Sequence, residues 1–283
     1  MRTKWLPLLF VVLAASESAR TTVEIQVGPT GEYAIAVNAA VWYRSVDAPL
    51  LCDTPLTYHS KQAATGTDAI GPWKGTVVTF TSGSTPVVEH TYKQYTAVPE
   101  AAVVTVKYLT NLDTRSICDG GAAGNITYIN TVVGAEALAL NTTAGGLVNM
   151  LRTLTWARGL SMQASTGLAS LGTGGIQAGP VISTDPHSET TLVWSTLDSH
   201  KVVPQNNNAS RYSIGLSGAF KAIAKGFSHS VVLIATSGGP TAAMYAWGAF
   251  MQSVAGKPRV SDRTLSYIGY FTECVILCII VCV

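Results

Sequence analysis

The chain has 283 residues, of which 47% are apolar and 12% are charged, and its formal net charge is +2. This composition excludes a disordered chain, and the length allows one large domain or two modest ones. Lysine and arginine form no basic block, so the sequence predicts no nucleic-acid partner.

The N-terminus has the features of a cleaved signal peptide, which we place at residues 1–18. Arg2 and Lys4 precede the apolar run Trp5–Ala15, and small residues allow cleavage after Ser16 or Ser18. The run is shorter than the ~20 residues that a membrane span requires, which argues against an anchor. We therefore expect a secreted protein, located outside the cell or in the endomembrane lumen.

Sequons and cysteines agree with this location. Asn125, Asn141 and Asn208 each begin an Asn-x-Ser/Thr sequon and are predicted glycosylation sites. Cys52 and Cys118 are the two cysteines of the mature chain before its C-terminal tail. In an oxidising compartment they fit either a disulfide or two separate buried thiols, because the sequence does not give their separation.

Residues 21–133 have the pattern of consecutive β-strands separated by turn formers. Apolar residues alternate with polar ones on both sides of Gly28–Gly31, which predicts a hairpin over 22–38. Further strands are predicted at Trp42–Tyr43, Thr76–Phe80, Val87–Tyr95 and Ala102–Tyr108, with a turn-rich stretch at Gly66–Trp73. Strands at this spacing are typical of a sandwich rather than of βαβ units.

The following segment, to residue 235, is predicted to be β-structure with longer loops. For Gly159–Gly179 we expect exposed loops or weak strands. Strands are predicted at Leu147–Trp156, Pro180–Ile182, Thr190–Trp194, Arg211–Gly215, Ala219–Ile223 and Ser230–Ala235, and a loop at Pro204–Ser210.

A helix follows the last of these strands. Ser237–Pro240 ends the strand, and apolar residues then recur at helical spacing over Thr241–Ala255. The fold class is therefore all-β, a large β-sandwich with one C-terminal exit helix. We divide the chain into a sandwich at 19–240, the helix and a linker at 241–263, and a beginning strand with an apolar tail at 264–283.

The tail Cys274–Val283 is uncharged and rich in β-branched residues. It is too short to span a membrane, although membrane contact remains an alternative. Its cysteines, Cys274, Cys278 and Cys282, lack companion ligands, so no metal site is predicted. We interpret the tail as the product of a truncated or frame-shifted reading frame.

Catalytic motifs of the common hydrolases and nucleotide-binding proteins are absent from the sequence, and no cofactor is predicted. The acidic candidates for acid–base chemistry lie in turn-like contexts, where we expect them to cap turns or face solvent; they are Asp68, Asp185, Asp198, Asp262 and Glu273. We expect His229, just before a strand, to be a hydrogen-bonded structural histidine. We expect the tryptophans to be core residues, and the alternative is that they stack on sugar rings. They are Trp42, Trp73, Trp156, Trp194 and Trp247.

Four stretches, in order, resemble α-galactosidase and raffinose-synthase-like glycoside hydrolases. They are Gly66–Phe80 (GTDAIGPWKGTVVTF), Gly179–Val181 with Thr190–Val202 (TTLVWSTLDSHKV), Gly218–Ala235 (GAFKAIAKGFSHSVVLIA), and Trp247–Arg259 (WGAFMQSVAGKPR) with Asp262–Glu273 (DRTLSYIGYFTE). The resemblance implies a galactose-mutarotase-like supersandwich preceding a (β/α)₈ barrel that carries both catalytic carboxylates. Glu273 falls where that family has an aspartate, which we expect to line the substrate pocket. After Glu273 the resemblance ends.

The resemblance implies a non-catalytic sandwich of a protein acting on α-galactoside-type sugars, with the barrel missing. One alternative is a stand-alone carbohydrate-binding module, which requires two coplanar exposed aromatic rings in one groove. The other is a surface protein held by its apolar tail. If a barrel has been lost, we expect the helix face of Trp247, Phe250 and Met251 to be an exposed apolar patch.

Overall fold

The computed structural model describes residues 20–256 with internal gaps. The gaps are 46–48, 52–53, 114–127, 132–134, 138–139, 143–146, 150–151, 158–160, 166–179, 186–187, 200–204, 209–210 and 218–221. The signal peptide, the linker, the strand predicted at Leu265–Thr272 and the apolar tail all lie outside the described residues.

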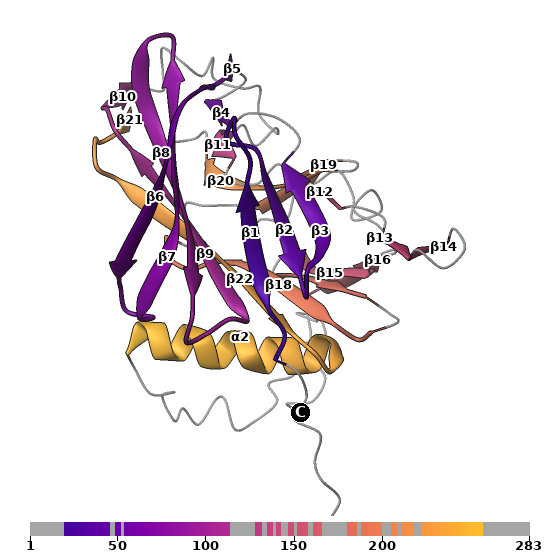
Figure 1. The fold of residues 1–283 in the computed structure, drawn as a ribbon. Coiled ribbons are helices and arrows are strands. Elements are labelled where there is room, and N and C mark those ends of the chain that lie inside the picture. Colours follow the sequence, from indigo (N-terminus) through magenta and orange to yellow (C-terminus); the bar gives the residue numbers. More distant parts are fainter. Residues whose placement is uncertain are drawn as a thin grey trace, which may run out of the picture.

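Two β-sheets face each other, as Figure 1 shows, and in the described residues they have seven and nine strands. The seven-stranded sheet runs β1 (Val23–Val27), β2 (Tyr33–Val37), β3 (Ala40–Ser45), β12 (Ala135–Ala137), β20 (Arg211–Ser217) and β11 (Tyr128–Thr131), with β19 (Gln205–Asn208) paired to β20. The nine-stranded sheet runs β16 (Ser161–Ser165), β15 (Arg152–Ala157), β17 (Val181–Thr184), β18 (Thr191–Thr196), β22 (Ser228–Thr236), β9 (Ala101–Tyr108), β8 (Thr85–Tyr95), β7 (Pro72–Ser82) and β6 (Thr57–Thr67).

Short strand pairs and one helix complete the described elements. The pairs are β4 (Leu50–Leu51) with β5 (Thr54–Pro55), β10 (Leu112–Asp113) with β21 (Ala222–Ile223), and β13 (Leu140–Thr142) with β14 (Leu147–Asn149). The helix α2 (Gly239–Ala255) follows β22. This architecture confirms the predicted all-β sandwich with a C-terminal helix.

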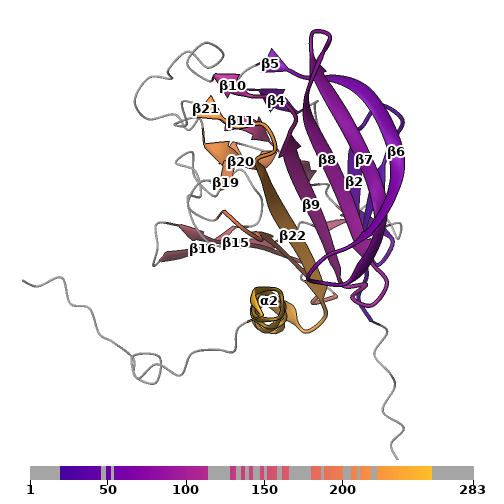
Figure 2. The same cartoon turned by 90° about the vertical axis from the view of Figure 1, so that its left-hand side faces the viewer.

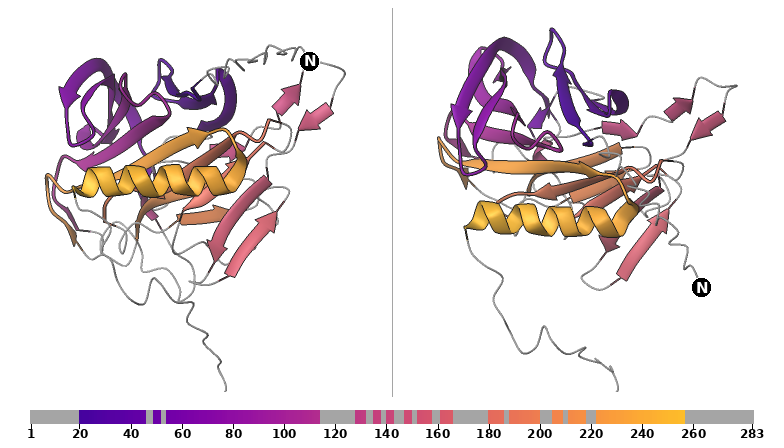
Figure 3. Two further views of the ribbon diagram at one scale, coloured as in Figure 1. Left: turned by 90° about the horizontal axis from the view of Figure 1, so that it is seen from below. Right: turned by 60° about the horizontal axis from the view of Figure 1, so that its bottom comes forward.

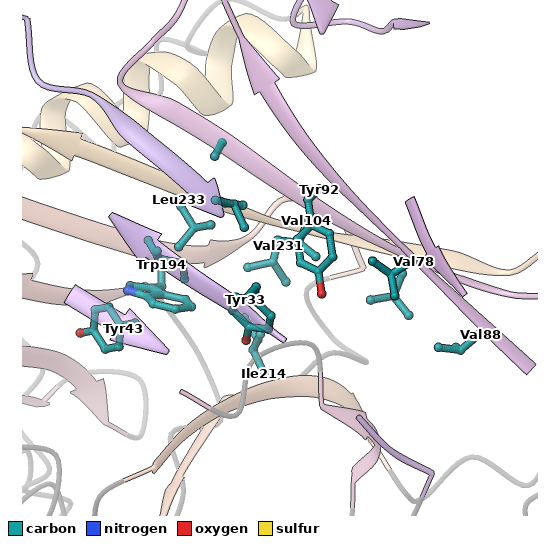
Figure 4. Close-up of a cluster of buried hydrophobic side chains, with 14 of the residues drawn as sticks. Tyr33, Tyr43, Val78, Val88, Tyr92, Val104, Trp194, Ile214, Val231 and Leu233 are labelled. Carbon is teal, nitrogen blue, oxygen red and sulfur yellow. The ribbon is translucent and has the colours of Figure 1, made fainter. Parts of the chain in front are cut away.

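The core between the sheets is built from alternate residues of the central strands. On β22, Val231 and Leu233 point toward the seven-stranded sheet, while Val232 and Ile234 point toward α2. Both faces are buried, so this strand is almost continuously apolar rather than alternating. Figure 4 shows the inner set meeting aromatic side chains such as Tyr92 and Trp194.

Helix α2 lies across the outer face of the nine-stranded sheet, as Figures 2 and 3 show. It begins after Gly238, whose φ of 93° is left-handed, and it ends at Gly256, whose N–H donates to the Ser253 carbonyl at 3.2 Å. Both conformations favour glycine because it has no side chain to clash. The predicted bounds, Thr241–Ala255, agree with the structure to within two residues at the N-terminal end.

The expectation of an exposed patch on α2, which followed from a lost barrel, was wrong, and this covered face counts against the loss of a barrel. Phe250 is 9% exposed and packs with Trp247 and Met251 against apolar residues of the nine-stranded sheet, among them Val103 and Ile234. The periodic face therefore covers the chain's own sheet. Burial of each large apolar side chain in such a contact contributes roughly 1.5–3 kcal/mol.

Three other local predictions need correction. The loop predicted at Pro204–Ser210 contains strand β19. The single strand predicted at Leu147–Trp156 is divided into β14 and β15, which pair with different partners. No strand was predicted at β6, whose eleven residues are mostly polar or small and largely exposed; ten of them pair with β7.

Candidate functional site

The described acidic candidates each have a local structural role. The Asp185 Oδ2 accepts a hydrogen bond from the Ser188 hydroxyl at 2.7 Å. The Asp198 Oδ1 accepts one from the Ser230 backbone N–H at 3.2 Å. Asp185 therefore holds its own turn, as expected, whereas Asp198 binds a strand that is 32 residues away in the chain. Asp262 and Glu273 lie outside the described residues.

Asp68 lies at the centre of a polar cluster with Lys93 and Tyr95. It sits in the turn between β6 and β7, where its Oδ1 accepts the Ile70 N–H at 3.0 Å. Its Oδ2 accepts from the Lys93 ammonium at 3.0 Å and from the Tyr95 hydroxyl at 2.9 Å, both on β8. The Lys93 ammonium also lies 5.1 Å from the ring centre of Trp73.

The electrostatics of this cluster keep Asp68 ionised. Partial burial by itself raises the pKa of the carboxyl, but the hydrogen bonds from Lys93 and Tyr95 outweigh it and lower that pKa. Burial and the neighbouring carboxylate raise the pKa of Tyr95. A carboxylate that already accepts three hydrogen bonds is a poor proton acceptor for a substrate. The cluster instead stabilises the turn between β6 and β7.

The histidines divide into one exposed and two buried residues in the described chain. His59 on β6 is exposed, whereas His90 on β8 and His229 on β22 are fully buried. His229 is structural, as expected, but the predicted hydrogen bond is wrong: neither ring nitrogen has a hydrogen-bond partner among the described residues. His187 and His200 lie outside the described residues.

The tryptophans do not form a stacking platform in the described residues. Trp42 and Trp194 are buried between the sheets, and Trp247 of α2 is partly buried against the outer face of the nine-stranded sheet. Trp73 is half-buried, and the side chain of Trp156 is outside the described set. Among the described large apolar side chains, Tyr245 is the exposed one, at 78%, so the paired rings that a binding module needs are not found there.

The remaining predicted sites are placed only in part. Asn141 lies on β13 and Asn208 ends β19. Asn125, Cys52, Cys118 and Glu273 lie outside the described residues, so their roles stay predictions.

Neither a metal site nor a membrane-spanning helix is found among the described residues. No group of three or more His, Cys, Asp or Glu side chains there is arranged to hold a metal ion. No helix found in that part of the chain is long and apolar enough to cross a membrane.

Comparison with known proteins relates the chain to others through its fold. No protein-family model matches it, and no curated protein matches its sequence. Among solved structures it is similar to the α-N-acetylgalactosaminidase NagBb from Bifidobacterium bifidum. The complex with Gal-NHAc-DNJ aligns over 82% of this chain and 38% of that one, with 9% identity and a TM-score of 0.55. The ligand-free form aligns over 81% and 37%, with 9% identity and a TM-score of 0.50.

These values establish a fold found in a glycoside hydrolase. The chain spans less than two-fifths of the length of that enzyme. The likeness supports the fold that the sequence resemblance implies.

Proposed function

We propose that this chain is the non-catalytic β-sandwich of a secreted glycoside-hydrolase-like protein that acts on α-galactoside-type sugars. The observation that carries the proposal is the fold, shared over four-fifths of the chain with part of an α-N-acetylgalactosaminidase. The ordered sequence motifs support the same family group, in which a barrel follows the sandwich.

The state of the acidic side chains supports a non-catalytic role. Glycosidases place two carboxylates roughly 5–10 Å apart across the scissile bond. Asp68, Asp185 and Asp198 are each held by donors of a turn or a neighbouring strand. In the parent protein the sandwich stabilises the barrel and contributes a loop to the rim of its substrate pocket.

The first test is to sequence the transcript and the genomic DNA beyond the codon for Thr272. We expect another frame or exon to continue with Asp-Asn-Gly and with βα units of a barrel. A continuation that encodes an unrelated domain would overturn the proposal.

The second test is a hydrolysis assay on the full chain secreted from a eukaryotic host. We expect no turnover of 4-nitrophenyl α-galactoside or of 4-nitrophenyl α-N-acetylgalactosaminide, because the described acids are engaged. Turnover that survives purification would contradict the non-catalytic role. Calorimetric titration with galactose and N-acetylgalactosamine separates a binding module, which binds without turnover, from a supporting domain, which does neither.

A further inference from the structure

Strand β6 forms one edge of the nine-stranded sheet. Within the described part of the chain it pairs with β7 alone, and ten of its eleven residues take part in that pairing. Alternate backbone N–H and C=O groups of an edge strand point away from its neighbour, so about half of those in β6 face outward. A further strand therefore finds a row of hydrogen-bond donors and acceptors along this edge.

The features that usually protect an edge strand leave most of β6 open. Natural edges are protected by lysines, prolines and bulges. The lysine of β6, Lys61, instead donates its ammonium to the backbone carbonyls of Val27 and Gly28 at the end of β1, in the opposite sheet. The strand contains no proline, and its bulge lies near its N-terminal end. Residues 60–67 are therefore accessible for pairing.

An incompletely buried apolar corner adjoins this edge. Four residues that pack against one apolar cluster keep part of their surface exposed: Ile70, Trp73, Met251 and Val254. The Trp73 ring lies directly against Gly66 of β6, because a Cβ atom on that glycine would be 2.6 Å from the ring. The corner is thus continuous with the open edge, and apolar side chains placed over the end of β6 would bury more of it.

The chain leaves α2 beside the same corner. Ala243, near the start of α2, packs against β17 and β18, whereas Val254, near its end, belongs to the same cluster as Ile70 in the turn between β6 and β7. Figure 1 shows the helix reaching the lower end of β6. Residues 257–264 follow, and eight residues span at most about 29 Å. Residues 265–272 are therefore within reach of the C-terminal end of β6.

The sequence of residues 265–272, LSYIGYFT, suits a strand at this position. It is the uncharged stretch that the sequence predicts to be a strand, and its eight residues match the length of residues 60–67. As a strand it would carry large apolar residues on both faces, with Leu265, Tyr267 and Phe271 on one and Ile268 and Tyr270 on the other. One of these faces would extend the apolar corner around Trp73.

We propose that residues 265–272 join the nine-stranded sheet as a further strand, antiparallel to residues 60–67 of β6. A segment that starts at the C-terminal end of β6 and follows its edge runs opposite to β6. The short linker holds this segment beside the edge at an effective concentration on the order of millimolar, which favours it over a second copy of the chain. The pairing is a property of this 283-residue chain and does not depend on the proposed function.

Hydrogen–deuterium exchange of the secreted full chain tests the pairing at residues 60–67. We expect nearly all amides there to exchange slowly, whereas an unpaired edge leaves about half of them exposed to water. The variant Tyr267→Pro/Ile268→Pro removes two adjacent N–H groups, one of which faces β6 in either register. It should remove protection from about half of the amides. The matched control, Val260→Pro/Ser261→Pro in the linker, should leave the protection unchanged.

The natural chain decides the question even if the proline variant does not fold. Full protection that does not change on dilution supports the pairing. Free exchange of about half of the amides would overturn it and leave residues 265–272 free for a following barrel. Protection that persists in Tyr267→Pro/Ile268→Pro would show that another group covers β6. Protection that falls on dilution, with a change from dimer to monomer in sedimentation, would assign the edge to a second copy instead.

Discussion

Tyr43 and Ser183 join the two sheets through a hydrogen bond inside the core. Tyr43 lies on β3 of the seven-stranded sheet and Ser183 on β17 of the nine-stranded sheet. The Tyr43 ring also meets Trp194 edge-on, with centres 4.7 Å apart, as Figure 4 shows. Burial raises the pKa of Tyr43 to about 12, so this hydroxyl remains protonated at physiological pH. The Tyr43–Ser183 hydrogen bond therefore fixes the position of one sheet relative to the other.

Replacing Tyr43 by phenylalanine should destabilise the fold by about 1–3 kcal/mol, because the buried Ser183 hydroxyl loses this partner. Urea unfolding of the full chain at pH 7.5 measures the loss. The double variant Tyr43→Phe/Ser183→Ala should recover a large part of it, since no polar atom of that pair is then left unpaired. Tyr245→Phe on the exposed face of α2 is the matched control. If the losses of unfolding free energy in Tyr43→Phe and in Ser183→Ala add up to the loss in the double variant, the two residues do not interact.

At the residue scale, the sequence predicted roles that depend on neighbours along the chain. A capping role for Asp68 follows from its turn, and the Ile70 N–H fulfils it. The contacts with Lys93 and Tyr95 were not predictable, because these residues are 25 and 27 positions away. They reach Asp68 through the pairing of β6, β7 and β8, which the sequence does not specify.

At the scale of elements, the close approach of β7 and β8 depends on one glycine. A Cβ atom on Gly75 would lie 1.8 Å from the backbone oxygen of Tyr92 on β8. Gly248 on α2 is the contrasting case, because a Cβ there would meet no atom within 4 Å. Gly75 is therefore required by the packing of the two strands, whereas Gly248 only lowers the stability of the helix.

Gly75→Ala should therefore cost about 1–3 kcal/mol or more, since a backbone atom cannot rotate away from the added methyl group. Gly248→Ala should stabilise the chain by up to about 1 kcal/mol, the difference in helix propensity. Thermal and urea unfolding of the two variants, compared with the natural chain, measure both effects. A neutral Gly75→Ala would mean that β7 and β8 separate more easily than their register indicates.

Strands and the helix differed in how well the sequence revealed them. The central strand β22 was predictable because a β-branched run is typical of a strand buried on both faces. The edge strand β6 has no apolar alternation, since most of its residues are exposed, and only its pairing with β7 defines it. Helical periodicity revealed α2, but not the sheet that its apolar face covers.

At the scale of the molecule, three layers share the apolar residues: a sheet, a second sheet and α2. The sandwich was predictable from regularly spaced strands, whereas the packing of α2 on the outer face was not, because periodicity gives a buried face without its partner. The described side of α2 that points to solvent, with Tyr245, is mostly polar or small.

The tail Cys274–Val283 is uncharged, rich in Val and Ile, and contains no proline. Uncharged segments rich in Val and Ile with no proline are prone to intermolecular β-pairing. We expect deletion of Glu273–Val283 to raise the fraction of secreted chain that elutes as a single species in size-exclusion chromatography. The triple variant Cys274→Ser/Cys278→Ser/Cys282→Ser is the matched control, because it removes the thiols and keeps most apolar residues. If the serine variant gives the same gain, thiol cross-linking rather than β-pairing limits the yield. A lower yield or a lower melting temperature after the deletion would show that the tail packs on the sandwich.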